Sequence, residues 1–143
     1  MKKIKYIFSI AIITLILTSC GSKYDFEHAE KLLEKIEEED KLTNNDYLEM
    51  IELCEIGFSC AIDEYEAALD IKNKYDCRDA LKEISNDDEL NFIFGYSGQM
   101  YLTLEQAAEA DELKSDTKKR FRELKKQHEK IIKLVEKIEK KIS

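Results

Sequence analysis

The side chains that could perform acid–base, metal or nucleophilic chemistry in this 143-residue chain are two histidines, several carboxylates and four cysteines. His28 and His128 lie far apart, and neither stands in a metal-binding spacing such as His-Glu-x-x-His. His128 falls on an apolar helical stripe, which predicts a core or edge histidine. His28 has glutamates on either side, which predicts a surface residue.

Carboxylates gather in three runs, at 37–40, 63–66 and 87–89. Glycoside hydrolysis needs two carboxylates about 5 to 9 Å apart in a cleft. A di-metal site in a helical bundle needs Glu-x-x-His on facing helices, a pattern that this sequence lacks. Helix faces and helix caps account for all three runs, so we expect no enzyme, no metal and no cofactor.

The cysteines are Cys20, Cys54, Cys60 and Cys77. Cys54 and Cys60 fall on one predicted helix about 9 Å apart along its axis, which is beyond the reach of a disulfide. A nucleophilic thiolate needs a neighbouring cation or histidine, and none is close in sequence to either residue. We therefore expect buried thiols at 54, 60 and 77, with an intrachain bridge as the lesser alternative.

The N-terminus has the pattern of an export signal. Lys2, Lys3 and Lys5 form a basic start, and residues 7–17 are almost all apolar. Eleven helical residues rise about 16 Å, too short for a hydrocarbon core of about 30 Å. A permanent transmembrane anchor is therefore the minor alternative.

Leu17-Thr18-Ser19-Cys20 follows this run and resembles the lipobox of bacterial lipoproteins. The resemblance covers only the signal and the cleavage junction. It implies that residues 1–19 are removed as a signal peptide and that Cys20 becomes a lipidated N-terminus, with palmitate among its acyl chains. The alternative is an ordinary signal peptide, or a cytoplasmic apolar N-terminus, with a cysteine there by chance.

Among lipoproteins of double-membrane bacteria, an Asp after the lipidated Cys retains the protein in the inner membrane. Gly21 stands there in this chain, which favours the outer membrane with the domain facing the periplasm. The acidic cluster that directs some lipoproteins to the cell surface is missing from residues 21–24, although surface exposure stays open. In a single-membrane bacterium the same anchor would place the domain outside the cell.

Charge is unevenly distributed along the chain. Without residues 1–19, 20 basic and 31 acidic residues remain, a charge of -11, which disfavours nucleic acid and anionic lipid as partners. Residues 118–143 carry +7 and residues 20–117 carry -18. We expect the basic C-terminal helix to lie against acidic helices of its own bundle. The alternative is that it meets an acidic partner.

Hydrophobic periodicity predicts helices at 24–40, 44–74, 87–111 and 116–142, with a short helix at 77–84. Thr43 with Asp46 and Asn86 with Glu89 predict capping boxes. The fold expected is all-α, an antiparallel bundle of about four long helices plus a short one, after a cleaved signal peptide. Residues 20–24 would form the lipidated tether and 25–143 one domain, in which the helix at 87–111 is the most buried.

A heptad seam runs through the C-terminal helix. Its members are Phe121, Leu124, His128, Ile131, Val135, Ile138 and Ile142. Such a coiled-coil seam packs on another helix, either in this chain or in a second copy. A homo-oligomer through 121–142 is therefore possible.

The helix at 87–111 holds the candidate binding residues Phe92, Phe94, Tyr96 and Tyr101, for which core packing is the alternative. The glycines Gly57, Gly95 and Gly98 all fall inside predicted helices, where glycine is unfavourable. We expect Gly57 and the Gly95/Gly98 pair to mark a close helix crossing. The alternative is a kink or an unwound turn at 95–98.

These observations favour a small membrane-anchored lipoprotein of the cell envelope that binds or scaffolds a protein partner through its acidic helical domain. An immunity-type or inhibitor protein is the first alternative, since it too needs only a shaped acidic surface. A carrier of an apolar ligand and an enzyme are less favoured.

Overall fold

The computed structural model describes residues 23–143, which form five helices. They are α2 (Phe26–Glu37), α3 (Asn44–Leu69), α4 (Lys74–Asn86), α5 (Asp88–Glu109) and α6 (Ser115–Ile142). No strand occurs in this part of the chain, and the predicted all-α bundle is confirmed. The predicted signal peptide and Cys20 lie outside the described residues.

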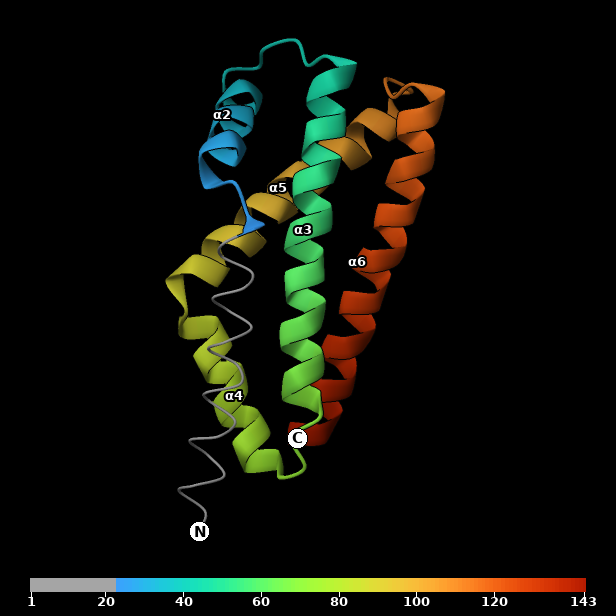
Figure 1. Ribbon diagram of the computed structural model, residues 1–143. Coiled ribbons are helices and arrows are strands. Elements are labelled where there is room, and N and C mark those ends of the chain that lie inside the picture. The colour runs from blue at the N-terminus through green and yellow to red at the C-terminus, as the bar shows by residue number, and fades with distance from the viewer. Residues whose placement is uncertain (1–22) are drawn as a thin grey trace.

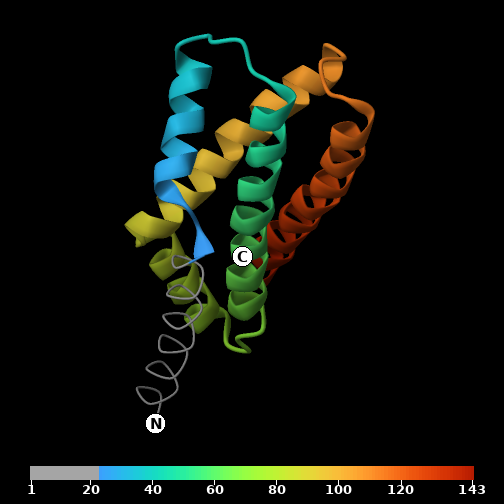
Figure 2. The same cartoon turned by 45° about the horizontal axis from the view of Figure 1, so that its top comes forward.

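The central helix is α3. On one side of it α6 runs in the same direction, and α4 runs the opposite way on the other side. α5 also runs the opposite way and crosses behind α3 toward the start of α6 (Figures 1 and 2). Half of the 26 residues of α3 are buried, against seven of 22 in α5. The expectation that α5 is the most buried helix is therefore wrong. Apolar residues surround α5, but none of the described helices covers its outer face.

Short polar side chains set two helix starts. The Thr43 hydroxyl accepts a hydrogen bond from the Asp46 amide at 3.1 Å, and the Asp46 carboxylate accepts one from the Thr43 amide at 2.8 Å, which confirms the first capping box. The second predicted cap is wrong by one residue. Because α4 continues through Asn86, the N-cap of α5 is Asp87, which has an extended backbone. Its carboxylate accepts a hydrogen bond from the Leu90 amide at 2.8 Å.

The seam of α6 packs within the chain, mainly on α3 and further along on α4. Phe121, Leu124 and Ile138 are buried, and the other members are half-buried. Arg120 pairs with Glu55 at 3.2 Å, and Lys130 pairs with Glu66 at 3.0 Å. These ion pairs confirm that the basic helix lies against an acidic helix of its own bundle.

Two cationic side chains donate hydrogen bonds to carbonyl groups at the C-terminal ends of α3 and α6. The Lys141 ammonium donates to the carbonyls of Leu69 and Ile71 at the end of α3. The Arg78 guanidinium of α4 donates to the carbonyl of Ile142 at the end of α6. Helix C-termini leave carbonyls without intrahelical partners and carry partial negative charge, so both contacts are favourable.

Gly57 lies at a close crossing of α3 with α5, as predicted, and it faces Ser97 and Ile93. Gly95 and Gly98 do not take part in this crossing. Both are exposed on the far side of α5, where an added Cβ atom would meet nothing within 4 Å. That part of the prediction is wrong. The alternative of an unwound turn also fails, because α5 is continuous through both glycines.

Candidate functional site

Two general features of residues 23–143 bear on function. These residues hold no group of three or more His, Cys, Asp or Glu side chains placed to bind a metal ion. None of their helices is both long enough and apolar enough to cross a membrane. Cys20, the predicted lipidation site, lies outside this part of the chain.

Two of the four predicted binding aromatics lie at the surface of α5, near α2. Phe92 is 54% exposed, and its ring lies 5.8 Å from that of Tyr96. The Tyr96 hydroxyl donates a hydrogen bond to the Glu30 carboxylate of α2 at 3.2 Å. Phe92 and Tyr96 therefore form one small aromatic pair beside the start of the domain.

The other two aromatics have packing roles. Phe94 is half-buried, with its ring 6.2 Å from that of Tyr65 on α3. Tyr101 is buried and stacks on His128 of α6, with ring centres 4.3 Å apart. Its ring also lies 5.6 Å from that of Phe58. The core alternative therefore applies to Tyr101.

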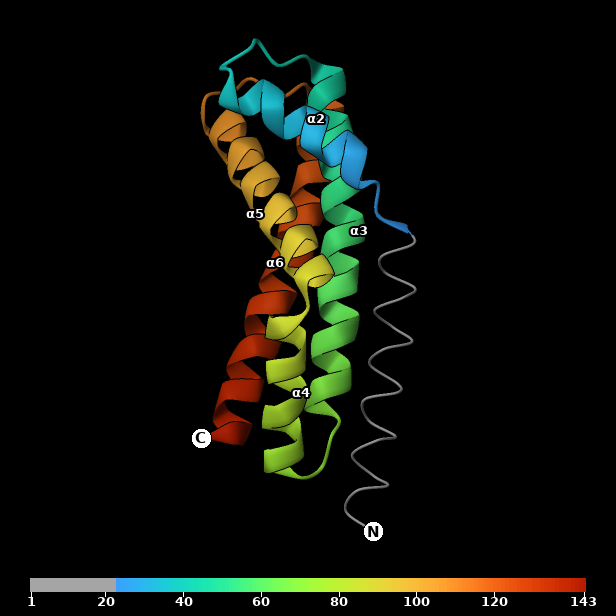
Figure 3. The same ribbon diagram turned by 90° about the vertical axis from the view of Figure 1, so that its left-hand side faces the viewer.

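The outer side of α5 is a continuous exposed surface without charge. Residues 90–104 include no Asp, Glu, Lys or Arg, in a chain of which 38% is charged. The exposed members, spaced by one or three residues along one side of the helix, are Asn91, Phe92, Gly95, Gly98, Gln99 and Leu102. We call these six residues the uncharged face of α5. Figure 3 shows α5 nearer to the viewer than α6.

Leu102, 54% exposed, is the large apolar residue of this face that the sequence prediction missed. The available signal was the fifteen-residue stretch without charge between Glu89 and Glu105. The prediction relied on aromatic residues, among them Phe92 and Tyr101. Only the first of these two side chains points away from the core.

Tyr24 is docked in the interior at the beginning of the domain. It is only 4% exposed, and its ring meets that of Phe26 edge-on at 5.1 Å. Burial raises the pKa of its phenol, and the adjacent Ser97 hydroxyl of α5 lowers that pKa in part. Neither hydroxyl makes a well-formed hydrogen bond within residues 23–143. Tyr24 therefore joins the N-terminal segment to α5 chiefly by packing.

Glu64 is a buried carboxylate on α3, in a run that the sequence analysis explained by helix faces and helix caps. Its side chain is inaccessible, and neither carboxylate oxygen has a hydrogen-bond partner among the described residues. Burial raises the pKa of Glu64 to about 7, with smaller contributions from the charges of Asp87 and Asp63. Such a group is mostly protonated in the folded domain below about pH 7.

The remaining candidates behave as structural groups. His28 lies 3.2 Å from the Glu49 carboxylate of α3, at the surface as predicted. His128 is the edge histidine that its seam position predicted. Cys54, Cys60 and Cys77 are buried, and no disulfide joins them in the described part of the chain. Burial raises the pKa of the thiols of Cys54 and Cys77, which makes them poor nucleophiles.

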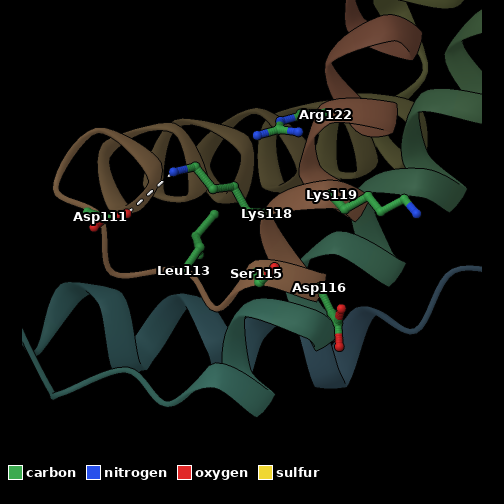
Figure 4. Close-up of a pocket in the computed structure, with 7 residues that line it drawn as sticks. All are labelled: Asp111, Leu113, Ser115, Asp116, Lys118, Lys119 and Arg122. Atoms are coloured by element: carbon green, nitrogen blue, oxygen red, sulfur yellow. Dashed lines mark hydrogen bonds and ion pairs between the residues drawn. The ribbon is translucent and has the colours of Figure 1, made fainter.

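A hollow of about 450 Å³ lies at the turn between α5 and α6 (Figure 4). Its lining is mostly charged and consists of Asp111, Leu113, Ser115, Asp116, Lys118, Lys119 and Arg122. Lys118 approaches Asp111 at 3.4 Å across it. An apolar ligand would have to displace water from these charges, so this hollow is not the site of an apolar carrier.

No protein-family model, curated protein or solved structure matches this chain. The assignment of a role therefore rests on the residues of the chain and their geometry.

Proposed function

We propose that this chain is a lipid-anchored protein of the bacterial cell envelope whose acidic helical domain binds or scaffolds a protein partner. The observation that carries the proposal is the short distance in sequence between Cys20 and Tyr24. Leu17-Thr18-Ser19-Cys20 resembles a lipobox, and Tyr24 is already buried in the domain. Four Cα–Cα steps span at most about 15 Å, so a lipid on Cys20 would hold the domain at the bilayer surface.

The proposed role is binding, because the described surface is richly charged. Gly21 after the lipidated residue supports the outer membrane, with the domain in the periplasm. At least two acyl chains would be required for stable anchoring, since a single chain gives only reversible binding.

An inhibitor or immunity-type role is the second candidate. Supporting it is an exposed acidic run at 37–40, at the turn from α2 to α3. These four carboxylates project where a basic partner could reach them without disturbing the core. Replacing all four by their amides would weaken binding to such a partner, and the effect would shrink at high salt.

The anchor is tested by labelling cells with a palmitate analogue and determining the mass of the purified protein. The wild-type chain should begin at Cys20 and carry the label. Cys20→Ser should remove both the label and the processing. The double variant Cys20→Ser/Ser22→Cys is the matched control, because it keeps a cysteine but moves it out of the lipobox position. A wild-type chain that retains residues 1–19, or lacks the label, would contradict the proposal.

The partner is sought by cross-linking in intact cells, followed by purification from the envelope. A scaffold should cross-link to a resident envelope protein whether or not residues 37–40 are neutralised. An inhibitor should cross-link to a basic protein and lose that product in the neutralised variant. These opposite outcomes separate the two roles.

A further inference from the structure

We propose that the uncharged face of α5 rests on the bilayer into which the lipid of Cys20 inserts, with Phe92 and Leu102 in the headgroup region. The occupant of this face is a surface of zwitterionic phospholipid. The inference rests on the lipid anchor proposed above, and it adds which side of the domain meets the membrane.

The tether places this face near the bilayer. Tyr24 is buried, so only Gly21, Ser22 and Lys23 separate the anchored residue from the domain. Tyr24 packs on Phe26 at the start of α2, and one turn later in that helix Glu30 accepts a hydrogen bond from the Tyr96 hydroxyl. Tyr96 lies one helical turn after Phe92 and pairs with its ring. The tether therefore reaches the domain beside the Phe92 end of the face.

The chemistry of the face suits a lipid surface. Phe92 and Leu102 are each 54% exposed, and the positions between them on this side include Gly95, Gly98 and Gln99. An added Cβ atom at either glycine would meet open space, so no side chain stands over the backbone there. None of the six residues of this face carries a charge that would have to leave water when the face meets the headgroups, and aromatic side chains favour that region.

The other exposed apolar side chains lie among charges and make suitable controls. Tyr75 has the cations of Lys74 and Arg78 near its ring, at 5.4 and 5.8 Å from the ring centre. Ile132 on α6, 45% exposed, is followed by Lys133. Bringing either of these surfaces onto lipid would desolvate charged groups, which is unfavourable.

The absence of tryptophan from the chain allows a direct test. Phe92→Trp, Leu102→Trp, Tyr75→Trp and Ile132→Trp are each made in the full chain, and the lipidated proteins are reconstituted into phosphatidylcholine vesicles. Half of the vesicles carry brominated acyl chains, which quench nearby tryptophan. We expect blue-shifted, quenched emission at 92 and 102, and unquenched emission at 75 and 132.

Each other outcome overturns the inference in a distinguishable way. If the proteins float with vesicles but tryptophans at 92 and 102 are no more quenched than those at 75 and 132, the anchor stands and the face does not meet lipid. A blue shift without quenching that grows with protein density would assign the face to a second copy of the chain. If the wild-type protein fails to float, the anchor proposal fails, and this inference fails with it.

Discussion

A Cβ atom placed on Gly57 of α3 would lie 2.0 Å from the Oγ atom and 3.1 Å from the Cβ atom of Ser97 on α5. The two helices therefore cross at a distance that only glycine allows at position 57. Ser97 is itself buried, so its side chain has little room to retreat. This contact brings α5 onto the central helix and thereby decides which side of α5 faces outward.

Gly57→Ala should destabilise the domain by roughly 1–3 kcal/mol, because the new methyl group overpacks the crossing. Gly95→Ala is the matched control and should stabilise by roughly 0.5–1 kcal/mol through helix propensity alone. Urea unfolding measures both free energies. The cost of Gly57→Ala should fall in a Ser97→Ala background, since the clashing hydroxyl is then gone. Equal stability of the two alanine variants would show that α3 and α5 do not meet closely at Gly57.

Glu64 should make stability fall as the pH rises. The pKa of its carboxyl is about 7 in the folded domain, against an ordinary value near 4.5. Between these values the folded state holds a proton that the unfolded chain has released. This contribution is therefore complete below about pH 4.5 and is lost as the pH passes 7, in total about 3 kcal/mol.

Glu64→Gln should remove this part of the pH dependence and make the domain more stable than wild type at pH 8. Glu66→Gln is the control on the same helix, because Glu66 is half-exposed and paired with Lys130. Denaturant unfolding between pH 5 and pH 8 measures the effect. A Glu64→Gln variant with the same pH profile as wild type would mean that the buried carboxyl titrates normally.

Asp46 should contribute in the opposite direction. Burial alone would raise its pKa, but hydrogen bonds from the Thr43 amide at 2.8 Å and from Lys35 at 2.9 Å hold that pKa below its ordinary value. Its stabilisation is present at neutral pH and is lost as the pH falls through the lowered pKa. Asp46→Ala should cost about 1–2 kcal/mol at pH 7 and less in acid. Asn45→Ala, at an exposed neighbouring position, should change stability little at either pH.

Tyr24 should stabilise the domain through its ring and not through its hydroxyl. Tyr24→Phe should leave the free energy of unfolding unchanged or raise it by up to about 1 kcal/mol, because the buried hydroxyl lacks a well-formed hydrogen bond among the described residues. Tyr24→Ala should cost about 3 kcal/mol and expose the segment after Lys23 to proteases. If Tyr24→Ala is as stable and protease-resistant as wild type, the tether is longer than proposed.

Local patterns in the sequence determined the helices and some of their ends. The 3-4 spacing of apolar residues predicts α6, and Thr43 with Asp46 predicts the start of α3, because each signal acts within one or two turns of chain. Asn86 and Asp87 show the limit of such signals. Both side chains can cap a helix, and the choice between them depended on how far α4 extends.

Which face of a helix is covered was decided only by tertiary structure. Gly57 and Gly95 are equivalent in sequence, since both interrupt apolar helices, yet one is in contact with Ser97 and the other is open. In the sequence Glu64 cannot be distinguished from Asp63 and Glu66. It is buried because other helices pack around α3 at this position. By residue type Leu102 would be expected in the core. It is exposed because none of the described helices covers the outer side of α5. Helix caps and apolar periodicity depend on residues that are neighbours in the chain, so the sequence alone determined the helices. Burial depends on contacts between residues distant in the chain, so only the packing of the helices decided which side chains lie at the surface.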